Sequence, residues 1–147
     1  MLNGTQLRYA ALIARYSLAI AYLVAVADRL GLCGEYGDPQ ITWGNFTVFL
    51  GVVKHLNPWA PDFMIPIFGW GVTILEVALP IFLIIGFKIK ETALVSAALL
   101  LIFAVTMTTT GLLKSVFDYS VLSAFSCSLL LYCFEKFRMN EDKKQLN

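Results

Sequence analysis

Four long apolar runs constrain what this chain can fold into. They cover residues 9–31, 63–87, 92–113 and 119–135. Because about 20 helical residues cross a bilayer core about 30 Å thick, the first three runs are long enough to span it, while the fourth is shorter. Their apolar residues are continuous rather than alternating, which favours helices over the strands of a barrel. We therefore expect an all-α integral membrane protein, folded as a four-helix bundle.

The composition of the 147-residue chain agrees with a single membrane domain over residues 1–147. Hydrophobic residues make up 59% and charged residues 14%, whereas soluble domains have about 45–50% and about 25%. An unusually hydrophobic soluble helical bundle is the alternative. The basic residues are dispersed, which argues against nucleic-acid binding. One His and three isolated Cys argue against a metal, haem or thiol–disulfide site.

The outer loop between the first two runs, residues 32–62, is long for a compact bundle, and long loops are often functional. Within it, apolar residues recur at helical spacing from Trp43 to Leu56. Thr42 is placed to cap the start of this helix, and Asn57 with Pro58 to end it. Since about fifteen residues are too few to span a bilayer, we expect an interfacial or re-entrant helix.

The positive charges predict the orientation of the chain. With a cytoplasmic N-terminus, most Lys and Arg residues fall on the inner side, which favours cytoplasmic N- and C-termini. Residues 136–147 then form a cytoplasmic tail, and residues 32–62 face the periplasm or the cell exterior. The inner residues are Arg8, Arg15, Lys88, Lys90, Lys136, Arg138, Lys143 and Lys144, and the outer ones are Arg29, Lys54 and Lys114.

Glu76 is the most informative polar residue, because it lies in the middle of the second run. A charge at mid-bilayer costs about 2.5–3.5 kcal/mol by insertion scales, so it needs a partner. Tyr22 lies at a similar depth in the first run, and Arg15 has a long side chain, so we expect these two residues to be its partners. Arg15, Tyr22 and Arg29 recur every seven residues, which places them on one helix face.

Pro80 acts on the same position as Glu76. Proline has no N–H, so the carbonyl four residues earlier, that of Glu76, loses its helical donor. A freed carbonyl at membrane depth must be satisfied by a neighbour, water or a ligand. Gly69 and Thr73 lie on the same face as these two residues. The group is either a site for a ligand, proton or substrate, or a polar contact that only locks helix packing.

A second polar group is expected at the outer end of the bundle. Asp28 and Arg29 close the first run and Asp118 opens the fourth, so an Arg29–Asp118 ion pair would join the first and last helices. The outer loop supplies four lesser candidates for a binding site, which are Trp43, Asn45, Lys54 and His55.

Short motifs follow one another along the chain in a recognisable order. The first run ends in "ADRLGL", the loop contains "WGNF" and "LNPW", the central Glu of the second run precedes "IFLIIGFK", and the fourth run opens with "DYS". Together they resemble the DoxX family of small four-helix bacterial membrane proteins over most of residues 10–135. The resemblance implies a bacterial inner membrane, recurring polar positions at Arg15, Arg29 and Glu76, and no established catalytic residues.

The resemblance also implies a link to membrane complexes that oxidise quinols or thiosulfate. Because the sequence offers no haem, iron–sulfur or thiol-pair ligands, we expect a non-catalytic subunit or helper without an intrinsic cofactor. It would bind a quinone-like or lipid-like molecule and work with a membrane or peripheral oxidoreductase. One alternative is a small proton-coupled transporter that uses Glu76 and Arg15, and another is a structural or assembly factor. A homo-oligomer stays open in each case.

Overall fold

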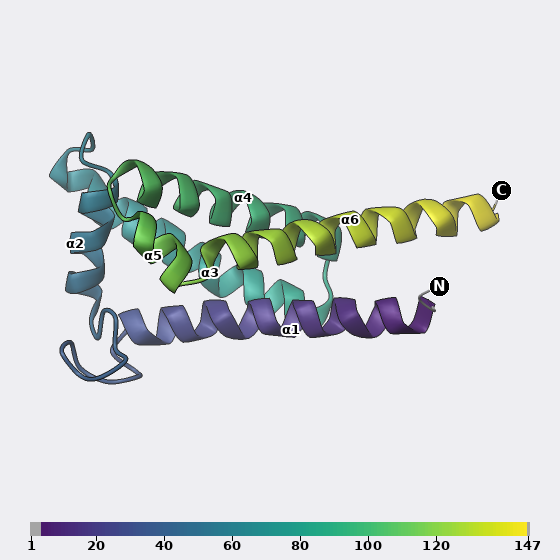
Figure 1. Ribbon diagram of the computed structural model, residues 1–147, viewed down its shortest axis with the longest axis horizontal. Coiled ribbons are helices and arrows are strands. Elements are labelled where there is room, and N and C mark those ends of the chain that lie inside the picture. Colours follow the sequence, from purple (N-terminus) through teal and green to yellow (C-terminus); the bar gives the residue numbers. More distant parts are fainter. Residues whose placement is uncertain (1–3, 147) are drawn as a thin grey trace.

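The computed structural model describes residues 4–146, and the regular secondary structure of these residues is helical, without any strand. These residues form four long α-helices and two shorter ones. The long helices lie lengthwise beside one another, and the shorter ones lie at one end of the molecule (Figure 1). The elements are α1 (Gly4–Arg29), α2 (Phe46–Leu56), the 3-10 helix η1 (Asp62–Met64), α3 (Ile65–Ile85), α4 (Ile89–Thr109), α5 (Leu113–Asp118) and α6 (Val121–Leu146).

Three of the described helices are long and apolar enough to cross a membrane, namely α1, α3 with its preceding turn, and α4. They confirm the first three predicted runs as helices, with shifted ends. The helix α3 stops at Ile85 because Gly86 adopts a left-handed conformation (φ 78°), which favours glycine. The next helix then begins at Ile89, so the turn between α3 and α4 is tight.

The fourth predicted run, residues 119–135, differs most from the structure. The preceding residues form the separate short helix α5, and α6 continues to Leu146 through the predicted tail. Ion pairs one turn apart, Arg138 with Glu135 and Lys144 with Glu141, support this polar half of the helix. Because its apolar part covers only residues 121–134, α6 is not among the described helices of membrane-spanning character.

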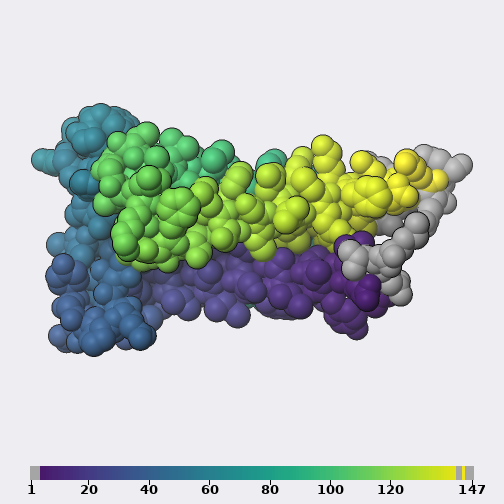
Figure 2. Space-filling model, viewed as in Figure 1, coloured from purple at the N-terminus to yellow at the C-terminus, as the bar shows by residue number. Residues whose placement is uncertain are grey.

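The long helices pack in a closed arrangement in which α1 contacts α3 and α6, and α4 contacts α6 and α3. Both chain termini lie at one end, which we call the terminal end (Figure 1). The opposite end, here the capped end, carries α2, α5 and the loop after α1. Figure 2 shows that the segment from the end of α1 through α2 covers this end of the molecule.

The core is apolar along the bundle axis, and the outward faces are apolar as well. Buried residues such as Leu79, Leu83 and Leu100 fill the interior. Large apolar side chains also point outward along α1, α3, α4 and α6, which is expected where helices face lipid rather than water. Examples of these exposed residues are Ile13, Ile20, Ile74, Ile102 and Leu130.

The helix predicted in the outer loop is present as α2, and it lies across the capped end (Figure 1). Its N-cap is Asn45, whose side chain accepts the N–H of Val48, so the prediction of Thr42 as the cap is wrong. Its end at Asn57 is as predicted. Phe49 and Val53 bury one face of α2 against the start of α3.

Candidate functional site

The central polar contact of the molecule is an ion pair between Arg29 and Glu76. Arg29 is the last residue of α1, and Glu76 lies in the middle of α3. Their Nη1 and Oε2 atoms are 2.5 Å apart, and the two side chains are only 3% and 5% exposed. Side chains of a helix lean toward its N-terminus, which lets Arg29 reach back into the bundle from the end of α1.

The prediction that Arg15 and Tyr22 pair with Glu76 is wrong, although all three side chains face the bundle. Arg15 donates from Nε and Nη2 to the Leu83 carbonyl, at 2.9 and 2.6 Å. This carbonyl lies in the last turn of α3, where the helix itself supplies no donors. Tyr22 instead shares a hydrogen bond of 2.7 Å with Ser96 Oγ.

Aromatic rings and a hydroxyl complete the surroundings of Arg29. Its Nη1 donates to Thr73 Oγ1 at 3.0 Å, and the Thr73 hydroxyl donates to the Gly69 carbonyl at 2.7 Å. The guanidinium carbon lies 4.0 Å from the ring centroid of Phe49 and 5.2 Å from that of Trp43. Cation–π attraction to these two rings partly replaces the water that the buried cation has lost.

The ion pair has unused hydrogen-bonding capacity. Among the described residues, Arg29 Nε and Glu76 Oε2 are buried atoms without a hydrogen-bond partner. Oε2 nevertheless lies 2.5 Å from Arg29 Nη1, so the carboxylate is held by the charge of the guanidinium.

Asp28, the neighbour of Arg29, holds the outer loop against the end of α1. Its Oδ2 accepts the N–H groups of Thr42 and Trp43 at 3.1 and 3.3 Å, and its Oδ1 accepts that of Gly44 at 3.2 Å. This contact brings together the "ADR" and "WGN" motifs and positions the Trp43 ring beside Arg29. The sequence contained both motifs, but nothing in it showed that they meet.

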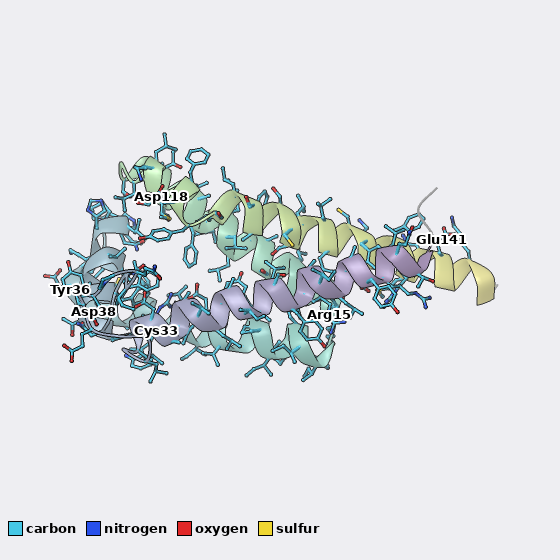
Figure 3. The ribbon with its side chains drawn as sticks, turned by 60° about the horizontal axis from the view of Figure 1, so that its bottom comes forward. Arg15, Cys33, Tyr36, Asp38, Asp118 and Glu141 are labelled. Atoms are coloured by element: carbon cyan, nitrogen blue, oxygen red, sulfur yellow. The ribbon has the colours of Figure 1, made fainter. Side chains whose placement is uncertain are left out.

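The predicted Arg29–Asp118 ion pair is also wrong. Asp118 forms a 2.5 Å ion pair with Lys114 one turn earlier in α5, and both side chains are largely exposed. Arg29 is turned inward to Glu76 and so cannot reach α5. Figure 3 shows Asp118 at the capped end, on the opposite half of the molecule from Arg15.

The remaining loop candidates have local structural contacts. Lys54 pairs with Asp62 at 2.7 Å and donates to the Ala60 carbonyl at 2.9 Å, which fastens the end of α2 to the start of α3. His55 Nε2 lies 3.1 Å from the Thr110 carbonyl at the end of α4. Neither residue lies in the Arg29–Glu76 contact.

The inward face predicted for α3 is confirmed. Gly69, Thr73, Glu76 and Pro80 are all buried, and α3 continues through Pro80 without a break.

The polar contact also has a neighbour that sequence reasoning missed, a chain of hydroxyls from Tyr22 through Ser96 to Ser128. Ser96 Oγ and Ser128 Oγ are 2.9 Å apart, so this chain joins α1, α4 and α6. The isolated serines inside apolar helices were the available signal.

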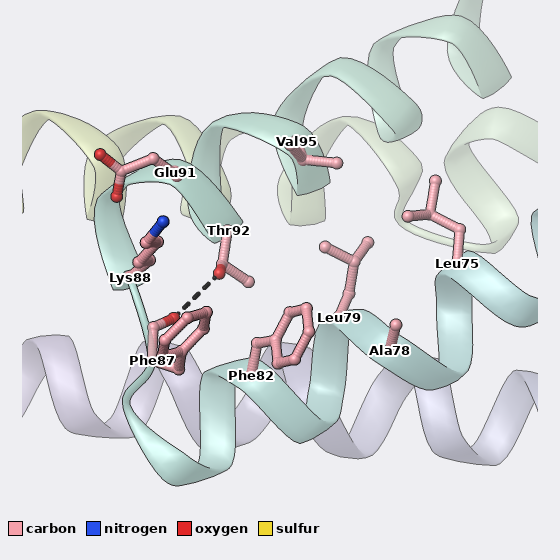
Figure 4. Close-up of a pocket in the computed structure, with 9 residues that line it drawn as sticks. All are labelled: Leu75, Ala78, Leu79, Phe82, Phe87, Lys88, Glu91, Thr92 and Val95. Carbon is pink, nitrogen blue, oxygen red and sulfur yellow. Dashed lines mark hydrogen bonds between the residues drawn. The ribbon is translucent and has the colours of Figure 1, made fainter.

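The larger of two pockets described for this structure lies outside the polar contact, and neither Arg29 nor Glu76 lines it. A cavity of about 280 Å³, open to the outside, lies between α3 and α4 near the turn that joins them (Figure 4). Its walls are apolar, and Lys88, Glu91 and Thr92 line it near the turn between the helices. Thr92 Oγ1 donates to the Phe87 carbonyl at 3.1 Å there. The apolar wall residues are Leu75, Ala78, Leu79, Phe82 and Val95.

The described residues contain no cluster of His, Cys, Asp and Glu that could hold a metal ion. The candidate site thus consists of a buried ion pair between α1 and α3 and of an apolar cavity between α3 and α4.

Comparison of the chain with protein-family models, with curated proteins and with solved structures gives no match.

Proposed function

We propose that the protein is a four-pass, DoxX-like protein of a bacterial inner membrane, with both termini in the cytoplasm. Three helices have membrane-spanning character, and both termini lie at the same end of the bundle (Figure 1). Since termini on one side require an even number of crossings, α6 would be the fourth span. The helix α2 would then lie in the outer interface, with Trp59 exposed at the headgroup level.

Within this membrane, the protein would act as a non-catalytic subunit or helper that binds a quinone-like or lipid-like molecule. The observation that carries this proposal is the cavity between α3 and α4. Its apolar walls suit a hydrocarbon chain or a prenyl tail, and Lys88 and Thr92 at one end suit a polar head group. The molecule would be held there for a membrane or peripheral oxidoreductase.

The geometry favours this function over proton-coupled transport. Glu76 is paired with Arg29, both side chains are buried, and two aromatic rings of the cap cover the Arg29 guanidinium. A transport cycle through Glu76 would have to separate a buried ion pair, which is costly in a low-dielectric interior. The α3–α4 cavity needs no such step to receive a ligand.

The proposal is tested with the full-length protein in a mild detergent, by native mass spectrometry after addition of decylubiquinone. We expect binding by the wild type and a loss of about tenfold in Ala78→Phe, which places a ring inside the cavity and narrows it. Ala98→Phe is the matched control, because Ala98 is exposed on α4 and does not line the cavity. Equal binding by wild type and Ala78→Phe would refute the assignment.

A further inference from the structure

A second, basic pocket lies at the terminal end, between α1 and α6. It has a volume of about 160 Å³ and is lined by Arg8, Leu12 and Arg15 from α1 and by Phe134, Glu135 and Arg138 from α6. None of these residues lines the α3–α4 cavity. The pocket is also remote from the Arg29–Glu76 contact, because Arg29 lies at the other end of α1.

The pocket carries an excess of positive charge. Its three arginines face one carboxylate, that of the buried Glu135, which pairs with Arg138 at 2.9 Å. Arg15 bonds to the backbone carbonyls of α3, and these dipoles do not cancel a full charge. Arg8 forms no ion pair with any side chain that the structure describes. Among the described side chains, two of the three positive charges thus have no counter-ion.

The depth of the pocket is set by Arg15. This residue bonds to carbonyls in the last turn of α3, so it marks the level at which α3 ends. From there α1 and α6 continue past the turn between α3 and α4 (Figure 1). Arg8 lies seven residues before Arg15, about 10 Å farther along the helix. In a four-pass arrangement, the pocket therefore lies where two helices leave the hydrocarbon core.

We propose that this pocket binds the phosphate of an anionic phospholipid, with its headgroup between α1 and α6. Arginine binds phosphate oxygens through its planar fork of donors, and basic pockets between membrane helices on the cytoplasmic side bind such head groups. Leu12 and Phe134 give the pocket an apolar wall that suits the adjoining acyl chain better than a free anion. The inference rests on the proposed four-pass arrangement, but not on occupation of the α3–α4 cavity.

The test compares phosphatidylglycerol with phosphatidylcholine, each titrated into the full-length protein in detergent and followed by native mass spectrometry. We expect the wild type to prefer phosphatidylglycerol, and Arg8→Gln to lower this preference roughly fivefold, as for one basic residue at a membrane surface. Lys114→Gln is the matched control, because it removes one positive charge from an exposed side chain at the capped end. It should retain the wild-type preference.

Three results would overturn the inference. These are equal binding of the two lipids by the wild type, an equal loss in Lys114→Gln and Arg8→Gln, and displacement of phosphatidylglycerol by millimolar inorganic phosphate. The last result would indicate a site for a free anion.

Since Arg8 is exposed, its replacement leaves the fold intact, and circular dichroism checks this. Ala78→Phe should keep the lipid preference, which separates this site from the proposed cavity ligand.

Discussion

At the scale of single residues, the stability of the capped end depends on how Arg29 and Glu76 neutralise each other. Each charge has left water, so each is costly unless the other is present. The two are not equivalent, because Arg29 also has Thr73 and two aromatic rings as partners. If Glu76 is replaced, Arg29 keeps these partners, but if Arg29 is replaced, the Glu76 carboxylate has lost its ion-pair partner. Replacing Arg29 should therefore lower the stability of the protein more than replacing Glu76.

Arg29→Gln is expected to destabilise the protein by about 3–5 kcal/mol, because it leaves a buried carboxylate unpaired. Glu76→Gln should cost less, and the double variant Arg29→Gln with Glu76→Gln should cost less than the two single changes summed. The measurement is denaturant unfolding in mixed micelles, followed by far-UV circular dichroism. Glu35→Gln, which changes an exposed loop carboxylate, is the control.

Additive losses of stability in the double variant would show that the two residues do not act as a unit.

The same variants separate the functional alternatives for Glu76. A structural contact predicts that Glu76→Gln lowers stability, whereas a proton-coupled transporter predicts that it abolishes pH-dependent flux in liposomes.

The hydroxyl chain gives a smaller residue-scale prediction. Tyr22→Phe removes the first member and leaves Ser96 and Ser128 bonded to each other. Interhelical hydrogen bonds in membrane proteins contribute about 0.6 kcal/mol on average and up to about 1.7 kcal/mol. We expect a loss in that range by the same unfolding measurement. Tyr16→Phe, at an exposed position of α1, should be neutral, and an equal effect of both changes would contradict the role of the chain.

At the scale of elements, the cap is held on the bundle by a few specific contacts. Asp28 binds three loop amides, and α2 places Leu50 against Gly69 of α3, where the absence of a side chain allows the close approach. Gly44 is also required, because its φ of 63° favours glycine and a Cβ there would meet the backbone of Tyr36. The cap is therefore a docked element rather than a loose loop.

Asp28→Ala should release this docking without unfolding the long helices. We expect amide hydrogen exchange at Thr42, Trp43 and Gly44 to accelerate at least tenfold, because each of these amides loses a charged acceptor worth about 1.5–3 kcal/mol. The control is Asp38→Ala, which removes an exposed carboxylate from the same loop, where it accepts only the Glu35 N–H. Unchanged exchange in Asp28→Ala, or a similar effect in the control, would contradict the assignment.

At the scale of the whole molecule, the arrangement of the ends predicts what each side of the membrane can reach. Cys33 is exposed in the loop of the capped end (Figure 3), and the terminal end carries both termini (Figure 1). In intact cells with a permeabilised outer membrane, a membrane-impermeant maleimide should label Cys33, while a C-terminal tag stays protected from protease. Cys33→Ser should abolish the labelling. Labelling only after lysis would contradict the proposed orientation.

The sequence by itself determined the features that depend on neighbouring residues along the chain. Run length and apolarity predicted three membrane-type helices, and helical spacing predicted α2 and the inward face of α3 that carries Glu76. These predictions succeed because helix formation and helix faces follow from local periodicity.

Only the tertiary structure decided which residues meet. It pairs Glu76 with Arg29 instead of Arg15, joins Asp28 to the amides around Trp43, and separates the polar contact from the α3–α4 cavity. When one helix is shifted slightly along another, each side chain meets a different partner on the neighbouring helix. A long side chain such as that of arginine can also reach along the helix in either direction, so sequence depth alone does not identify its partner. Contacts between helices are therefore set by packing and by the docked loop, neither of which the spacing of residues along the chain records.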